Sequence, residues 1–353
     1  MALLAGDHAP QITDRLAQAR RLHLGLWGLF FVCAVFSLST GATTVSFGTL
    51  LHAISGGELE PVERVVLYDI RLPRLVLGAL VGASLAVSGA VMQGLFRNPL
   101  ADPGLVGVSA GAGLGAIIAI VLGAGASWLS FAGIYLVPLA AFAGGWASTV
   151  ILYQVSTRRG RTSVATMLLA GIALGALAGA ASGVLVYMAD DAQLRDLTFW
   201  GLGSLAGATW AKIAAAGPII LAALLATPFL ARGLNGLALG EAAAHHMGIA
   251  VQLVKNAAIL SVAAATGAAV AVSGTIGFVG IVVPHLLRLA TGPDHRMLLP
   301  NAALLGASLL VFADVISRVV IAPAELPIGI ITAILGAPVF LWILLRRRSV
   351  IDL

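Results

Sequence analysis

Charged residues are scarce in this chain. Asp, Glu, Lys and Arg together make up 10% of its 353 residues, whereas hydrophobic residues make up 59%. A soluble domain usually carries about 25% charged residues, so this chain lacks the polar side chains that a surface in water requires. We therefore predict that most of its surface contacts membrane lipid.

Cysteine and the common catalytic motifs are also scarce. The one cysteine, Cys33, can form no intrachain disulfide. Neither of the two lysines, Lys212 and Lys255, is followed by Ser or Thr, so the sequence has no phosphate-binding loop of the Gly-Lys-Ser/Thr type. The histidines show no zinc-binding spacing, and no Gly-x-Ser-x-Gly motif occurs. We expect no resident metal or cofactor in this chain and no enzymatic ATP hydrolysis by it.

Long apolar runs, by contrast, fill the sequence. A spanning helix needs about 20 mostly apolar residues, and ten runs approach this length, which predicts one all-α transmembrane domain over residues 1–353. The runs centre on 24–40, 75–95, 104–124, 131–153, 163–188, 211–231, 254–272, 275–291, 299–320 and 326–345. The 42 glycines favour close contact between such helices.

The basic residues predict the orientation. With a cytoplasmic N-terminus, fourteen of the 20 Lys and Arg residues lie in cytoplasmic segments, as the positive-inside rule requires. Residues 1–23 are then a cytoplasmic tail, and ten spans return the C-terminus to the cytoplasm. We attribute the net charge of +5 to this asymmetry and expect no nucleic acid as a partner.

Two short patterns concern the organisation of the helices. The string GLFRNPLADPG, at 94–104, predicts a cytoplasmic turn, because a residue before proline avoids the helical region. The string AVSG occurs at 86–89 and at 271–274, in two predicted spans of opposite direction. This recurrence is consistent with two inverted halves of five helices, although four small residues can also recur by chance.

The longest predicted cytoplasmic connection, 233–250, contains the string LALGEAAAHHMG. Gly240 is expected to break one helix, Glu241 suits the positive N-terminus of the next, and Gly248 is placed to end it. This short helix is either a simple connection between two spans or an element that docks into a groove on a cytoplasmic partner.

The stretch SGTIGFVGIVVPHLLR, at 273–288, carries Gly274, Gly277 and Gly280 at a spacing of three. On a helix they would form a stripe that lets another helix or a second subunit pack closely, and Pro284 follows them. His285 is either a ligand or a histidine satisfied within the protein, and we favour the second interpretation.

Ionisable residues cluster near the predicted outer ends of two spans. Arg71 and Arg74, in RLPR, either anchor lipid headgroups or dock an acidic protein surface. Asp314 and Arg318 are spaced to pair within one helix, where Arg318 is expected to extend outward. Glu325 begins the last predicted span.

Five stretches of the sequence together resemble the permease subunits of type II ABC importers, the family that takes up vitamin B12, haem and ferric siderophores. They are RLPRLVLGALVGASLAVSGAVMQGLFRNPLADPGLVGVSAGAG, LALGEAAAHHMG, SGTIGFVGIVVPHLLR, DHRMLLPNAALLGAS and ELPIGIITAILGAPVFLWILL. The resemblance extends from residue 71 to about residue 345 and includes the NPLADPG string.

This resemblance implies a ten-span permease of the bacterial inner membrane that pairs with a second copy of itself around a central path. It implies two cytoplasmic ATPase subunits, which hold ATP and Mg, and a periplasmic binding protein. By position, Arg71, Arg74 and Arg318 look like the arginines that meet the binding protein. The residues that resemble the ATPase-coupling element are Leu239, Gly240, Glu241, Ala242, His246 and Gly248. The residues expected to serve helix packing or gating are Gly274, Gly277, Gly280 and Pro284.

The stretch YMADDAQLRDLTFWGLGSL, at 187–205, most resembles the haem permeases. We therefore expect haem as the transported substrate, with ferric siderophores and cobalamin as alternatives. An ion-coupled secondary transporter is the alternative of another class. We assign no haem ligand to His285, Tyr187 or Met188, because tight ligation would slow release.

Overall fold

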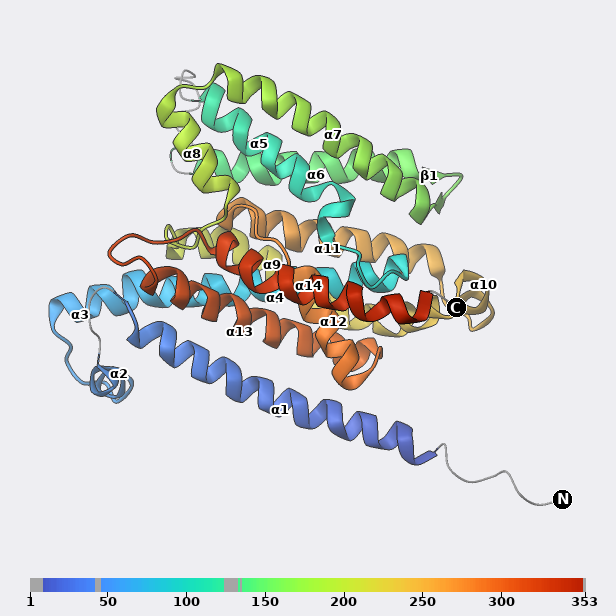
Figure 1. The fold of residues 1–353 in the computed structure, drawn as a ribbon, viewed down its shortest axis with the longest axis horizontal. Coiled ribbons are helices and arrows are strands. Elements are labelled where there is room, and N and C mark those ends of the chain that lie inside the picture. Colours follow the sequence, from blue (N-terminus) through green and yellow to red (C-terminus); the bar gives the residue numbers. More distant parts are fainter. Residues whose placement is uncertain (1–8, 42–45, 124–132, 134, 352–353) are drawn as a thin grey trace.

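The computed structural model describes the chain except for residues 1–8, 42–45, 124–132, 134 and 352–353 (Figure 1). The described part is mostly helical, with a π-helical turn at Val66–Arg71, a 3-10 helix at Pro103–Val106, short connections and one small hairpin. Its elements are α1 (Ala9–Ser39), α2 (Phe47–Ile54), α3 (Pro61–Val65), α4 (Leu72–Phe96), α5 (Val108–Gly123), α6 (Leu136–Ser156), β1 (Thr157–Arg158), β2 (Arg161–Thr162), α7 (Val164–Met188), α8 (Asp191–Gly201), α9 (Trp210–Ala238), α10 (Glu241–His246), α11 (Val251–Ser273), α12 (Val279–Thr291), α13 (His295–Val319) and α14 (Ile328–Ile351).

Ten apolar helices coincide with the ten predicted runs. Seven are long and apolar enough to cross a membrane, namely those that contain α1, α4, α6, α7, α9, α11 and α13. The other three, α5, α12 and Ile328–Trp342 of α14, are apolar but shorter. The predicted all-α membrane fold is confirmed.

The long helices run back and forth between two ends of the molecule (Figure 1). We call one end the α10 end, because α10 and the β1–β2 hairpin lie there, together with the start of α1 and the end of α14. The opposite end, the α8 end, holds α2, α3, α8 and the connection between α13 and α14. The predicted cytoplasmic tail, 1–23, includes the first turns of α1, and residues 1–8 lie outside the described part.

Helix α4 is the centre of the bundle. It packs against α9, α11, α12 and α13, and 83% of its apolar window is buried. Glycines permit these contacts: a Cβ on Gly82 would overlap the carbonyl oxygen of Gly306 in α13, and a Cβ on Gly89 would overlap that of Gly280 in α12. The prediction that small residues mediate helix contact is confirmed within the chain.

The helix that contains α4 begins earlier than predicted. The helical path is continuous from Pro61 to Phe96, with a wider π-type turn at Val66–Arg71 before Pro73. Proline lacks an N–H donor, and its ring collides with the preceding turn of a regular α-helix. Here the turn before Pro73 is wider, and the N–H of Leu72 donates to the carbonyl of Leu67 across it. RLPR therefore lies inside a helix rather than at its start.

The expected glycine stripe is wrong as a helical feature. Gly274 caps the end of α11 with φ +70°, residues 274–278 are not α-helical, and Gly280 belongs to α12. Gly274 and Gly280 still make close contacts, with the backbone of Trp200 and with Pro103 and Leu85, but a Cβ on Gly277 would meet no atom within 4 Å.

The two AVSG strings lie in different places. Residues 86–89 are inside α4, whereas residues 271–274 end α11. The two helices run in opposite directions, as predicted (Figure 1). The arrangement in two inverted halves stays a prediction.

The Gly82–Gly306 contact can be tested by substitution. We expect Gly82→Val to lower the midpoint of thermal unfolding in detergent, because the added atoms must separate α4 from α13 at a cost of about 1–3 kcal/mol. The matched control is Gly28→Val on the exposed face of α1, where a Cβ meets nothing within 4 Å. Equal midpoints for the two variants would contradict the close packing.

Candidate functional site

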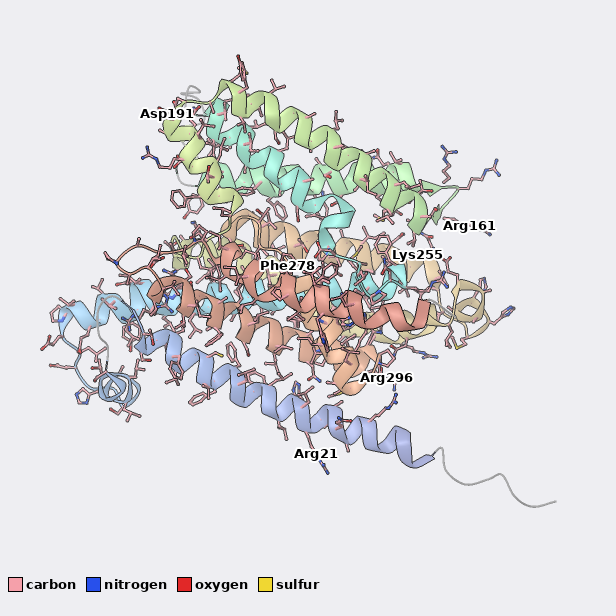
Figure 2. All side chains as sticks on the ribbon, in the orientation of Figure 1. Arg21, Arg161, Asp191, Lys255, Phe278 and Arg296 are labelled. Atoms are coloured by element: carbon pink, nitrogen blue, oxygen red, sulfur yellow. The ribbon has the colours of Figure 1, made fainter. Side chains whose placement is uncertain are left out.

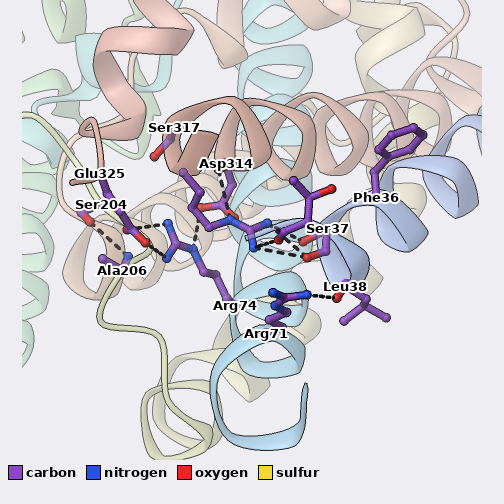
Figure 3. A network of polar contacts seen from close by, with 12 residues as sticks. Phe36, Ser37, Leu38, Arg71, Arg74, Ser204, Ala206, Asp314, Ser317 and Glu325 are labelled. Atoms are coloured by element: carbon purple, nitrogen blue, oxygen red, sulfur yellow. Dashed lines mark hydrogen bonds and ion pairs between the residues drawn. The ribbon is translucent and has the colours of Figure 1, made fainter. Parts of the chain in front are cut away.

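A cluster of charged side chains is buried at the α8 end (Figure 3). The Nε of Arg74 lies 2.7 Å from Oδ1 of Asp314, and its two terminal nitrogens lie 2.9 Å from the two carboxylate oxygens of Glu325. Arg74 therefore joins α4 to α13 and to the segment that precedes α14. A guanidinium that pairs in this two-pronged way has a fixed direction as well as a neutralised charge.

Arg318 and Arg71 complete this cluster by binding the end of α1. Arg318 pairs with Asp314 one turn earlier in α13 at 3.1 Å, and it donates to the carbonyls of Ser37 and Thr40. Arg71 donates to the carbonyl of Leu38 (Figure 3). The last carbonyls of a helix lack helical partners and carry partial negative charge, so the two arginines cap α1.

These contacts modify the predicted role of the three arginines. Arg71, Arg74 and Arg318 are only 3%, 5% and 8% exposed, and the expectation that Arg318 extends outward is wrong, because Asp314 and α1 hold it inside. The side chain of Glu325 is 36% exposed, compared with 3% for Asp314. Docking of another protein at this cluster stays a prediction, and Glu325 is its accessible carboxylate.

The sequence predicted one pair of this cluster and missed the others. Asp314 and Arg318 are four residues apart on one helix, and their pairing is confirmed. Arg74 lies 240 positions from Asp314, and no sequence period connects them. The only signal was that each is an ionisable residue within or beside an apolar run, where an unpaired charge is costly.

At the opposite end, α10 forms as predicted between two glycines. Gly240 has φ +105° and precedes Glu241, and Gly248 has φ +74° after the helix ends. The first part of the predicted connection, residues 233–238, is instead the last turns of α9. Within α10, the side chain of Ala244 is buried and those of Ala242 and His246 are exposed, as is Leu239 just before the helix.

A lysine that the sequence analysis did not single out holds α10 in place. The Nζ of Lys255, at the start of α11, lies 2.7 Å from the carboxylate of Glu241 and donates to the carbonyl of Thr162 at 2.9 Å. Lys255 is 4% exposed. The sequence did contain a signal for this contact. Lys255 is one of only two lysines in the sequence and lies at the edge of an apolar run, where a charge needs a partner.

The NPLADPG turn is built from local hydrogen bonds. Arg97 ends α4 with φ +51°, Asn98 Oδ1 accepts from the N–H of Leu100 at 3.0 Å, and Asp102 Oδ1 accepts from the N–H of Gly104 at 2.7 Å. Burial raises the pKa of the Asp102 carboxyl above its ordinary value, and the bond from Gly104 opposes part of that rise. The predicted turn is confirmed.

Pro284 in α12 leaves a helical carbonyl without its usual donor, and α4 supplies one. The proline has no N–H for the carbonyl of Gly280, and Gln93 Nε2 donates to this carbonyl at 3.2 Å. Arg288 donates in turn to the Gln93 side chain. The gating role of Gly274, Gly277, Gly280 and Pro284 stays a prediction.

The described residues contain no group of three or more His, Cys, Asp or Glu side chains arranged to hold a metal ion. His285 is buried within α12, whereas Tyr187 and Met188 are exposed at the end of α7.

Comparison with known proteins connects most of the chain to one family. The model of the FecCD transport family matches residues 29–346. The hemin transport system permease protein HmuU of Yersinia pestis is 46% identical over 330 residues, which are 93% of this chain and 97% of that protein. The vitamin B12 import system permease protein BtuC of Escherichia coli O9:H4 is 41% identical over 91% of this chain and 93% of that protein. A solved structure described as an inward-facing conformation of a metal-chelate type ABC transporter superposes with a TM-score of 0.81, at 32% identity, over 91% of this chain and 97% of that chain.

The ion cluster predicts unequal effects for its two acids. Asp314→Asn leaves Arg74 and Arg318 buried with less negative charge, which typically costs about 3–5 kcal/mol. Glu325→Gln removes the charge of the more exposed acid of the cluster. It should lower stability clearly less than Asp314→Asn does, because water reaches the side chain of residue 325. Thermal unfolding in detergent measures both, and an equal or larger loss for Glu325→Gln would contradict this account of the cluster.

Proposed function

The chain belongs to the FecCD transport family, and we propose that it is the permease subunit of an ATP-driven importer that moves haem from the periplasm to the cytoplasm. The observation that carries this proposal is the 46% identity to the hemin permease of Yersinia pestis over almost the full length of both chains. The chain is a multi-pass membrane transport protein, and we place it in the bacterial inner membrane.

We infer that the α10 end faces the cytoplasm. The segments at this end carry most of the basic residues, including Arg161 and Arg296, whereas Asp191 lies at the α8 end (Figure 2). A cytoplasmic excess of Lys and Arg sets the orientation of most membrane proteins. Both termini are then cytoplasmic, and the α8 end faces the periplasm.

We propose a full importer with two copies of this chain, two cytoplasmic ATPase subunits and one periplasmic binding protein. ATP and Mg would bind to the ATPase subunits. Helix α7 offers a surface for a second copy, because only 17% of its apolar window is buried within this chain, a share that α1 also shows. The exposed residues of α10 would seat on the ATPase, and Glu325 marks where the binding protein would reach the arginine cluster.

The proposed mechanism is alternating access. The driving free energy comes from nucleotide binding by the partner, because a ligand shifts a conformational equilibrium only through its different affinities for the two states. The α10 helices would move with the ATPases and change which side of the path is open. A weakly binding, apolar path suits release of a bulky macrocycle.

The alternative substrates are ferric siderophores and cobalamin. Cobalamin is favoured by the 41% identity to a vitamin B12 permease and by a 46% identity to the cobalamin import system permease protein of Halobacterium salinarum, which covers 81% of this chain and 75% of that protein, less than the hemin permease match covers. An ion-coupled secondary transporter is less consistent with the structure. Asp314, the acidic residue deepest in a span, is occupied by two arginines, and an ion-coupling carboxylate must be free to bind its ion.

The substrate is tested with the cognate periplasmic protein. We expect this protein to bind haem in preference to a ferric siderophore or cobalamin in a fluorescence-quenching titration. Vesicles that contain the permease, the ATPase and this protein should then accumulate haem in an ATP-dependent, vanadate-sensitive manner. Preference for another ligand would change the substrate, and uptake driven by an ion gradient without ATP would reject the importer.

The role of α10 is tested by adding bulk to its exposed face. We expect Ala242→Arg to weaken binding of the ATPase to the detergent-solubilised permease about tenfold. An unpaired charge buried in a protein contact from which water is excluded costs at least ~1.4 kcal/mol, and this free energy corresponds to a tenfold change in the dissociation constant. The matched control is Ala192→Arg on α8, an exposed alanine at the other end. Equal affinity for both variants would count against α10 as the seat.

A further inference from the structure

Few side chains of helix α10 pack against the membrane-spanning helices, so few contacts can transmit a displacement of α10 to them. It has six residues, and Ala244 is its buried side chain. Its other firm attachment in the described structure is the ion pair between Glu241 and Lys255. A push on α10 therefore enters the bundle through its covalent ends, through Ala244 and through Lys255.

Lys255 connects three segments that are distant in the sequence. Its ammonium group binds Glu241 of α10 and the carbonyl of Thr162 in the hairpin between α6 and α7, while its own helix, α11, crosses to the α8 end. Figure 2 shows Lys255 and Arg161 near each other at the α10 end. The buried charge has two directed acceptors, so its position fixes α10 and the hairpin relative to α11.

Gln252 strengthens the attachment of the hairpin. Its side chain accepts from the N–H of Thr162 at 2.9 Å and donates to the Thr162 hydroxyl at 2.6 Å and to Asn256 Oδ1 at 2.7 Å. Residues 252, 255 and 256 share one face of α11, one turn from its start. The side chains of two α11 residues, Gln252 and Lys255, therefore hold the hairpin, whereas Lys255 alone of the two also bonds to a side chain of α10.

Open space surrounds this junction. Cavities of about 570 Å³ and 710 Å³ are both lined by Glu241, Lys255, Arg161 and Thr162, and the smaller one also reaches Arg97 and Asn98 of the NPLADPG turn. The polar contacts, rather than dense packing, therefore determine how α10 is held against the hairpin.

From these contacts we propose that Lys255 is a positioning residue for transport: it transmits displacement of α10 to α11 and to the β1–β2 hairpin as one unit. The inference rests on the proposed function, in which the ATPase moves α10. Removal of Lys255 leaves α10 joined to α11 by the four-residue connection and by Ala244, without the ion pair, so less of its displacement reaches α11 and the hairpin, and ATP hydrolysis continues without its full yield of transported substrate.

The test uses the complete importer in vesicles, with haem uptake and ATP hydrolysis measured together. We expect Lys255→Met to lower the ratio of haem moved to ATP hydrolysed about tenfold, the size of a typical coupling between sites. Loss of stability lowers uptake and hydrolysis together and leaves their ratio unchanged. Lys255→Arg keeps both hydrogen bonds and should restore most of the ratio, whereas Arg296→Met, which removes an exposed cation at the same end, should leave it intact.

A second variant keeps the test decisive if Lys255→Met does not fold. Glu241 is half-exposed, so Glu241→Gln should fold and lower the ratio in the same direction. The double variant Glu241→Gln/Lys255→Met should be no worse than Lys255→Met alone, because both changes break one contact. An unchanged ratio in both single variants, with ATPase bound, overturns the role of Lys255 alone. A wild-type chain that binds no ATPase overturns the proposed function and this inference with it.

Discussion

A bilayer supplies neither hydrogen bonds nor counter-ions, and this constraint determines how the charged side chains buried among the described helices are arranged. Each charge or free carbonyl at membrane depth must find its partner inside the protein. The chain meets this requirement at few places: Arg74 with Asp314, Arg318 with the end of α1, and Gln93 with the carbonyl that Pro284 leaves free. Glycine, alanine and aliphatic side chains pack most of the remaining interior, where buried hydroxyls such as those of Ser148, Ser273 and Ser308 donate to backbone carbonyls.

The two ends of the bundle use the same chemistry for different purposes. At the α8 end, three arginines and two acids join α1, α4, α13 and the start of α14 into one body. At the α10 end, Lys255 and Gln252 join two small elements, α10 and the hairpin, to a single helix, α11.

Sequence patterns predicted those features that depend on near neighbours. The ten apolar runs, the breaks at Gly240 and Gly248, and the Asp314–Arg318 pair each depend on residues within one helix or turn, and each was predicted correctly. The glycine stripe at 274–280 was predicted wrongly, because periodic spacing does not reveal that the helix ends at Ser273. Contacts such as Arg74–Asp314 and Lys255–Thr162 depend on which helices lie side by side, which no local pattern contains.

The capping of α1 has a consequence for biosynthesis. The carbonyl of Ser37 is bonded by Arg318, a residue 281 positions later in the chain. Helix α1 is therefore synthesised long before the arginine that bonds this carbonyl, and the later insertion of α13 completes the end of α1. A chain truncated before residue 318 lacks this closure, because nothing then occupies the place of the guanidinium that bonds the carbonyls of Ser37 and Thr40.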